Sequence, residues 1–128
     1  MTEMTYAQAA RLGLREEMAR DPKVWALGED LGYEGGMAGQ YKDLQAEFGP
    51  NRIVDTPISE STIMGAAVGA ALAGTRPIAE MRFSDFAMCS VSELVNQAAK
   101  ARYMFGGQAR VPLVARMPIG IRGGIAAQ

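Results

Sequence analysis

Short apolar runs that alternate with segments of helical character constrain the fold of this chain more than any other feature. One apolar run covers residues 24–27, and further predicted strands cover 52–55, 76–81 and 111–116. The predicted helices cover 6–20, 40–48, 60–73, and a segment that begins at Ser84 or Asp85 and reaches Arg102 or Tyr103. Because parallel strands are usually joined by helical crossovers, we expect an α/β fold with a mostly parallel sheet and helices on both faces, in three layers.

Residues at the predicted helix ends support these boundaries. Thr5 is a predicted N-cap of the first helix, and Asp21-Pro22 ends it. Ser59 is positioned to cap the helix over residues 60–73, which Gly74 would end.

The helix over residues 60–73 also carries small residues at spacings of three and four, which would let another backbone approach closely. The spacing fits packing inside the domain and packing between subunits equally well.

Composition excludes several classes of function. The 128 residues carry a formal net charge of −1, so nothing in the charge favours nucleic acid or an anionic membrane as a partner. The longest small-apolar run, residues 63–73, is too short to span a bilayer. Residues 1–20 do not resemble a signal peptide, and the single cysteine, Cys89, fits a cytoplasmic protein. Because histidine is absent, any acid–base chemistry in this chain must use carboxyl groups.

Three local features are candidates for a site. The glycine-rich stretch 35–39 lacks the spacing of dinucleotide- and phosphate-binding loops, so we expect a flexible surface loop. Glu60 follows a predicted strand and begins a helix, where ligands of parallel sheets bind. Its position alone is more typical of an acid that interacts with the helix dipole. Phe83 and Phe86 follow another strand and could stack on a flat ligand, although such aromatics more often belong to the core.

Several segments together resemble one enzyme family. They are Asp55-Thr56-Pro57-Ile58-Ser59-Glu60, Gly65-Ala66-Ala67-Val68-Gly69-Ala70-Ala71 and Arg76-Pro77-Ile78-Ala79-Glu80, with further agreement at 28–30, 96–100, 102–103 and 111–116. This combination closely resembles the beta subunit of the thiamine diphosphate-dependent 2-oxo acid dehydrogenases, which act on pyruvate, branched-chain 2-oxo acids or acetoin. The likeness covers nearly the whole chain and corresponds to the N-terminal pyrimidine-binding domain of that subunit.

The resemblance implies an activity and its partners. The family is an α2β2 heterotetramer that decarboxylates a 2-oxo acid, or cleaves acetoin, and passes the acyl group to the lipoyl acyltransferase core. Thiamine diphosphate lies between the subunits. The alpha subunit holds its diphosphate and the magnesium ion, so this chain is expected to hold no metal ligand. Residues 102–107 resemble the pyruvate and acetoin members somewhat more than the branched-chain members.

The resemblance also assigns roles to individual residues. Glu60 matches the glutamate that shares a proton with the pyrimidine ring nitrogen and thereby activates the cofactor. Ile58 and Phe86 match pocket-lining positions, with Phe86 against the ring face. Arg82 is expected to contact the cofactor as well, although it stands at a position that varies among the relatives. Glu29 matches an acidic position that in some relatives belongs to a chain of carboxylates between paired active sites. Cys89 stands where some relatives carry another carboxylate of that chain.

The last residues of the sequence favour a truncation. The family continues past Gly-Ile-Ala-Ala-Gln with an active-site histidine, and here the sequence ends at Gln128. We therefore expect residues 1–128 to form a pyrimidine-binding domain that is incomplete at its C-terminus, with the transketolase-like C-terminal domain absent. The isolated chain should then be inactive. Two alternatives are the equivalent domain of a transketolase or deoxyxylulose phosphate synthase, and a non-catalytic remnant that binds a partner.

Overall fold

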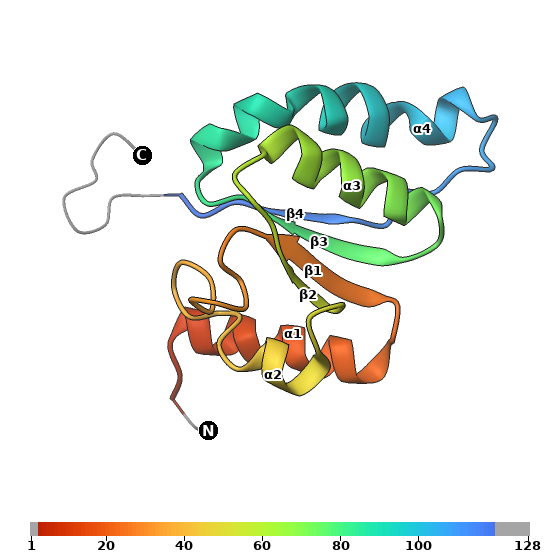
Figure 1. Cartoon of the computed structure of the whole chain (residues 1–128). Helices are drawn as coiled ribbons and strands as arrows, with labels where there is room; N and C mark the ends of the chain where they lie inside the picture. The colour runs from red at the N-terminus through yellow and green to blue at the C-terminus, as the bar shows by residue number, and fades with distance from the viewer. Residues whose placement is uncertain (1–2, 120–128) are drawn as a thin grey trace.

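The computed structural model describes residues 3–119 and contains one parallel sheet (Figure 1). Its strands lie in the order β2-β1-β3-β4, and all three pairings are parallel. The strands are β1 (Val24–Gly28), β2 (Ile53–Asp55), β3 (Arg76–Glu80) and β4 (Val114–Arg116). The predicted parallel α/β fold is therefore confirmed, with a final strand shorter than the apolar run that predicted it.

Helices cover both faces of the sheet, which gives the three predicted layers (Figure 1). One face carries α1 (Tyr6–Arg20) and α2 (Leu44–Phe48), and the other carries α3 (Glu60–Leu72), η1 (Ser84–Ser90), η2 (Glu93–Ala98) and α4 (Ala99–Met104). Each face has its own apolar core. The first core is built around Met18, Ala26, Leu31, Tyr41, Leu44 and Ile53, and the second around Leu27, Ile63, Met64, Ala67, Ala79 and Met81.

Two predicted helices are wrong in detail. The helix expected over residues 40–48 is limited to α2, because Asp43 adopts the left-handed conformation with φ 65°, which a right-handed helix cannot contain. The helix expected from residue 84 to about residue 103 is divided into a 3₁₀ segment, a π segment and a short α-helix. Near the first division the Ser61 hydroxyl donates to the Cys89 carbonyl, so a side chain from α3 competes for a backbone acceptor of η1.

The predicted helix caps are confirmed in position and differ in mechanism. Thr5 forms a capping box with Gln8: the Gln8 N–H donates to Thr5 Oγ1 at 3.3 Å, and the Thr5 N–H donates to Gln8 Oε1 at 2.8 Å. Ser59 precedes α3, but its hydroxyl donates to the Pro57 carbonyl at 3.0 Å and makes no cap bond. Thus the first turn of α3 is not closed by a side chain of its own N-cap.

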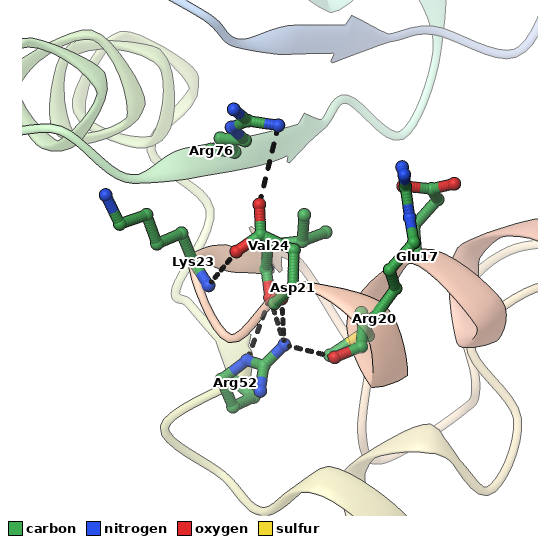
Figure 2. Close-up of polar contacts among 8 residues, drawn as sticks. Glu17, Arg20, Asp21, Lys23, Val24, Arg52 and Arg76 are labelled. Carbon is green, nitrogen blue, oxygen red and sulfur yellow. Dashed lines mark hydrogen bonds and ion pairs between the residues drawn. The ribbon is translucent and has the colours of Figure 1, made fainter.

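The amino-terminal edge of the sheet is fixed by Arg52, which the sequence did not single out (Figure 2). Its Nε donates to the Val24 carbonyl at 2.8 Å, and its Nη2 donates to the Met18 carbonyl at 2.9 Å and the Asp21 carbonyl at 3.2 Å. Asp21 in turn pairs with Arg76 at 3.4 Å. These contacts join the end of α1 to the beginnings of β1 and β3, so the sheet is tied at the edge opposite the candidate site.

Packing of α3 answers part of the question raised by its small residues. Ala67 and Ala71 are buried against the domain, whereas a Cβ atom added at Gly69 would meet no atom within 4 Å. Internal packing therefore accounts for one side of the helix and does not require glycine at position 69.

In residues 3–119 no helix is long and apolar enough to cross a membrane.

Candidate functional site

The carboxyl ends of the parallel strands bring the predicted site residues to one edge of the sheet. Glu29 directly follows β1, residues 56–60 follow β2, and Arg82 lies two positions after β3. The register pairs Gly28 with Asp55, and the Thr56 N–H donates to the Gly28 carbonyl at 3.0 Å. Glu29 is therefore held beside the segment that leads to Glu60. This is the edge where open parallel sheets bind ligands.

Glu60 lies at the beginning of α3, where the helix dipole favours a carboxylate. Its side chain is half-buried. Ile58, two residues earlier, is 80% exposed. Between the strand and these two residues, Thr56 Oγ1 is buried and has no hydrogen-bond partner within the described residues. An acid, an exposed apolar surface and an unpaired hydroxyl thus occur within five residues.

Phe86 reaches this edge from η1. The Ser61–Cys89 hydrogen bond ties η1 to the first turn of α3, next to Glu60, and η1 packs against α3. The Phe86 ring is half-buried and meets Phe83 edge to face, with ring centroids 5.5 Å apart and an interplanar angle of 90°. The two aromatics that the sequence singled out are therefore in contact with each other. Cys89 itself is exposed.

Glu29 is the member of the site whose protonation the structure perturbs. It is half-buried, and burial raises the pKa of its carboxyl above the ordinary value; the negative charge of Glu60 raises it further. The positive charge of Arg82 acts in the opposite direction, and Asp30 adds to the increase. Glu29 and Glu60 are thus close enough to influence each other, which is the relation expected of two neighbouring acids.

Arg82 is held by the loop after β1, which continues into the glycine-rich stretch 35–39. Its Nη2 donates to Glu34 Oε2 at 3.1 Å, and its Nη1 lies 3.4 Å from Asp30 Oδ2. The loop itself differs from the expected flexible surface loop, because Gly35 and Gly36 are buried. A Cβ atom at Gly36, where φ is 72°, would come within 2.7 Å of the Tyr41 ring. Close packing against the body of the domain therefore explains these glycines.

A cluster of polar residues around Glu80 lies at the same edge, and the sequence analysis did not predict it. Glu80 ends β3 and is only 4% exposed. It accepts hydrogen bonds from Tyr41 Oη at 2.9 Å and Gln40 Nε2 at 3.2 Å, and Arg116 Nη1 lies 3.6 Å away. Burial raises its pKa, and these three neighbours oppose the increase. Burial and the charge of Glu80 raise the pKa of Tyr41. The signal in the sequence was Glu80 itself, because a charged residue within a predicted buried strand needs polar partners.

The carboxyl edge of the sheet around Glu60 is not enclosed by either of the two larger cavities. Cavities of about 390 and 740 Å³ flank the sheet, and neither is lined by Ile58, Glu60 or Phe86. Within residues 3–119, no group of three or more His, Cys, Asp or Glu side chains is placed to hold a metal ion. The site therefore presents one surface of a binding place and leaves the opposite surface open.

Comparisons with known proteins identify the class of domain that this arrangement belongs to. Residues 2–128 match the family described as transketolase, pyrimidine binding domain. The chain belongs to that family.

Within it, the chain is similar to beta subunits of 2-oxo acid dehydrogenases, as its sequence predicted. It is 45% identical to the 2-oxoisovalerate dehydrogenase subunit beta of Bacillus subtilis over 94% of its length. It is 45% identical to the pyruvate dehydrogenase E1 component subunit beta of Rickettsia bellii, and 44% identical to the mitochondrial protein of Bos taurus, each over 98% of its length. The match covers 37%, 39% and 35% of these three relatives, respectively.

Proposed function

We propose that this chain supplies the pyrimidine side of a thiamine diphosphate site in a 2-oxo acid dehydrogenase. The observation that carries the proposal is Glu60 at the beginning of α3, half-buried beside the 80% exposed Ile58, in a domain of the pyrimidine-binding family. A flat heterocycle with a hydrogen-bonding edge fits this surface, because it would cover Ile58 while its ring nitrogen faces a carboxyl group.

The neighbouring residues fit the same group. Phe86 offers an aromatic ring from η1, and the buried Thr56 hydroxyl lacks a partner within the described residues. Ile58 and Phe86 would contact the pyrimidine, and Glu60 would hold a proton at its ring nitrogen. The expected contact of Arg82 with the cofactor stays a prediction; here Asp30 and Glu34 hold its guanidinium group. Bound thiamine diphosphate would supply the nucleophilic carbon for decarboxylation.

The remaining contacts are assigned to a partner. An alpha subunit, in an α2β2 assembly, would bind the diphosphate and magnesium and close the open edge beside Ile58. This division agrees with the exposure of Ile58 at the open edge. The acyl product would pass to a lipoyl acyltransferase. The 128-residue chain alone is expected to have no dehydrogenase activity, which an assay with pyruvate and an artificial electron acceptor would test.

The substrate is proposed to be a small 2-oxo acid, with pyruvate first and acetoin as an alternative. Relatives named for pyruvate and for 2-oxoisovalerate are both 45% identical to this chain, so overall identity does not choose between them. The likeness of residues 102–107 to the pyruvate and acetoin members favours these two substrates over a branched-chain 2-oxo acid. Comparing kcat/KM for the two 2-oxo acids and acetoin in the assembled enzyme would show which of the three is the preferred substrate.

Glu60→Gln tests the proposed role directly. The amide keeps the size of the side chain but cannot exchange the acid proton, so turnover of the enzyme assembled with an alpha subunit should fall about 10²- to 10⁴-fold. The fold should be unchanged, because the side chain is half-buried and makes no hydrogen bond or ion pair described in the structure. The measurement is kcat together with thiamine diphosphate affinity by titration calorimetry.

Glu16→Gln provides the matched control. Glu16 is an exposed carboxyl on α1, two residues before Met18, whose carbonyl is bound by Arg52 at the amino-terminal edge of the sheet. This variant should retain full turnover. Equal turnover of the Glu60→Gln enzyme and the control would rule out the proposed acid.

A further inference from the structure

Arg82 connects two elements at the carboxyl edge of the sheet. It follows β3, and its side chain is 26% exposed. Its Nη2 donates a hydrogen bond to Glu34 at 3.1 Å, whereas its buried Nη1 lies 3.4 Å from Asp30 in an ion pair and has no hydrogen-bond partner within the described residues. A guanidinium group can hold two carboxylates at once because its donors form a fixed planar fork. The geometry therefore joins the end of β3 to the loop that follows Glu29.

The loop held by Arg82 begins with a constrained backbone. Asp30 has φ 53°, a left-handed conformation that is uncommon for residues other than glycine. The Asp30 carbonyl accepts hydrogen bonds from the N–H groups of Glu34 at 3.2 Å and Gly36 at 3.0 Å. Since Asp30 directly follows Glu29, a contact that fixes Asp30 also limits where the Glu29 carboxyl can lie.

Charge at this edge is unevenly distributed. Glu29 faces the carboxylate of Glu60 from α3 and that of Asp30 from its own loop, and Arg82 from the end of β3 provides the opposing positive charge. Arg82 also acts on Glu80, which is buried at the end of the same strand. Because the edge is partly buried, these charges are screened by water less than exposed charges would be.

We propose that Arg82 is a positioning residue that holds the Glu29–Asp30 backbone beside Glu60 and limits how strongly Glu29 competes with Glu60 for a proton. The inference rests on the proposed function, because it gives Glu60 the role of proton-holding acid. It differs from direct binding of the cofactor by Arg82. A residue that acts only on the cofactor would change cofactor affinity and leave the chain without cofactor unchanged.

The test is a carboxyl titration of Glu29 in the isotope-labelled 128-residue chain, followed by ¹³C NMR in the absence of cofactor. Arg82→Met removes the positive charge, so the Glu29 midpoint should move to higher pH. Arg82→Lys restores a charge but cannot reproduce the two-carboxylate fork, so its midpoint should lie between those of wild type and Arg82→Met. Amide hydrogen exchange in residues 31–36 should be about two- to fivefold faster in Arg82→Met, as expected for the loss of a partly exposed ion pair.

Arg20→Met is the matched control. Arg20 is also ion-paired, with Glu17, but it lies at the end of α1 and its side chain is 72% exposed. This variant should leave the Glu29 midpoint and the exchange of residues 31–36 unchanged. If it moves them as much as Arg82→Met does, the effect is general and the proposal is overturned.

The remaining outcomes separate this proposal from the proposed function. An unchanged or lowered Glu29 midpoint in Arg82→Met overturns the positioning role. If Arg82→Met does not fold, a Glu29 midpoint in Arg82→Lys equal to that of wild type overturns it instead. If the midpoint moves as expected while Glu60→Gln leaves turnover intact, Arg82 still positions Glu29 and the catalytic role of Glu60 is what fails.

Discussion

Two groups of polar residues lie at the same edge of the sheet and are built differently. Around Glu80 the chain closes its own site: the carboxyl is 4% exposed and has contacts from Tyr41, Gln40 and Arg116. Around Glu60 the chain leaves its site open, with Ile58 80% exposed and the Thr56 hydroxyl unpaired within the described residues. The first group satisfies the rule that buried polar atoms are hydrogen-bonded, and the second does not.

The difference indicates what each group is for. A closed polar cluster contributes to one defined packing of β3, β4 and the segment before α2, and it needs no further molecule. Under the proposed function, the open group around Glu60 would be completed by the bound cofactor. Changes at Glu80 should therefore be measured as stability of the chain, and changes around Glu60 as binding and turnover.

The largest expected effect on stability is that of Glu80→Ala. This change leaves the Tyr41 hydroxyl, the Gln40 amide and the Arg116 guanidinium without their acceptor. Breaking a buried charge pair costs about 3–5 kcal/mol, and the lower value applies because Arg116 remains 28% exposed. Urea unfolding of the chain should show the loss. Glu16→Ala on exposed α1 should change the free energy of unfolding by no more than about 0.5 kcal/mol. A loss at Glu80 as small as that would break the comparison.

A smaller effect is expected from pH. The pKa of Glu80 is raised above its ordinary value of 4.5 in the folded chain, so between these two values the folded state binds more protons than the unfolded state. The stability that Glu80 contributes is therefore complete below pH 4.5 and is lost as pH rises through the folded pKa. The free energy of unfolding of Glu80→Gln should accordingly gain on that of wild type as pH rises through this window. Glu29→Gln should show the same trend less strongly, because Glu29 is only half-buried. A Glu80→Gln variant that loses stability relative to wild type as pH rises would contradict the assigned direction.

Sequence predicted the sheet well, for a physical reason. Apolar runs such as residues 76–81 report burial on both faces of a strand, and parallel strands bring their carboxyl ends to one edge. The order of strands and helices along the chain is therefore enough to place Glu29 and Glu60 at the same edge. The roles of individual residues at the cofactor depended on the family resemblance and remain to be tested.

What could not be predicted depends on contacts between distant segments. Asp43 looks suited to a helix, yet it adopts φ 65° and shortens α2. The Ser61 hydroxyl reaches a carbonyl 28 residues away in η1. Tyr41, Glu80 and Arg116 come from three separate regions, and only the folded sheet shows that their charges and hydroxyl meet.

The smallest effect on stability is expected from Ile58→Ser, and it sharpens the comparison most. Because Ile58 is 80% exposed, the free energy of unfolding of the chain should change by no more than about 0.5 kcal/mol. The same substitution at Ile53, which is 0% exposed in β2, removes core packing and should be severely destabilising.

In the enzyme assembled with an alpha subunit, Ile58→Ser should have a large effect on cofactor binding, although its effect on stability is small. Covering the Ile58 side chain with the cofactor would contribute about 1.5–3 kcal/mol, so Ile58→Ser should weaken thiamine diphosphate binding about 10- to 100-fold in a calorimetric titration. Leu12→Ser, at an exposed position on α1, should leave the affinity unchanged. Unchanged affinity with Ile58→Ser would mean that the exposed isoleucine is ordinary surface. A large loss of stability would instead mean that it belongs to the closed part of the domain, so either result would remove the distinction between the two polar groups.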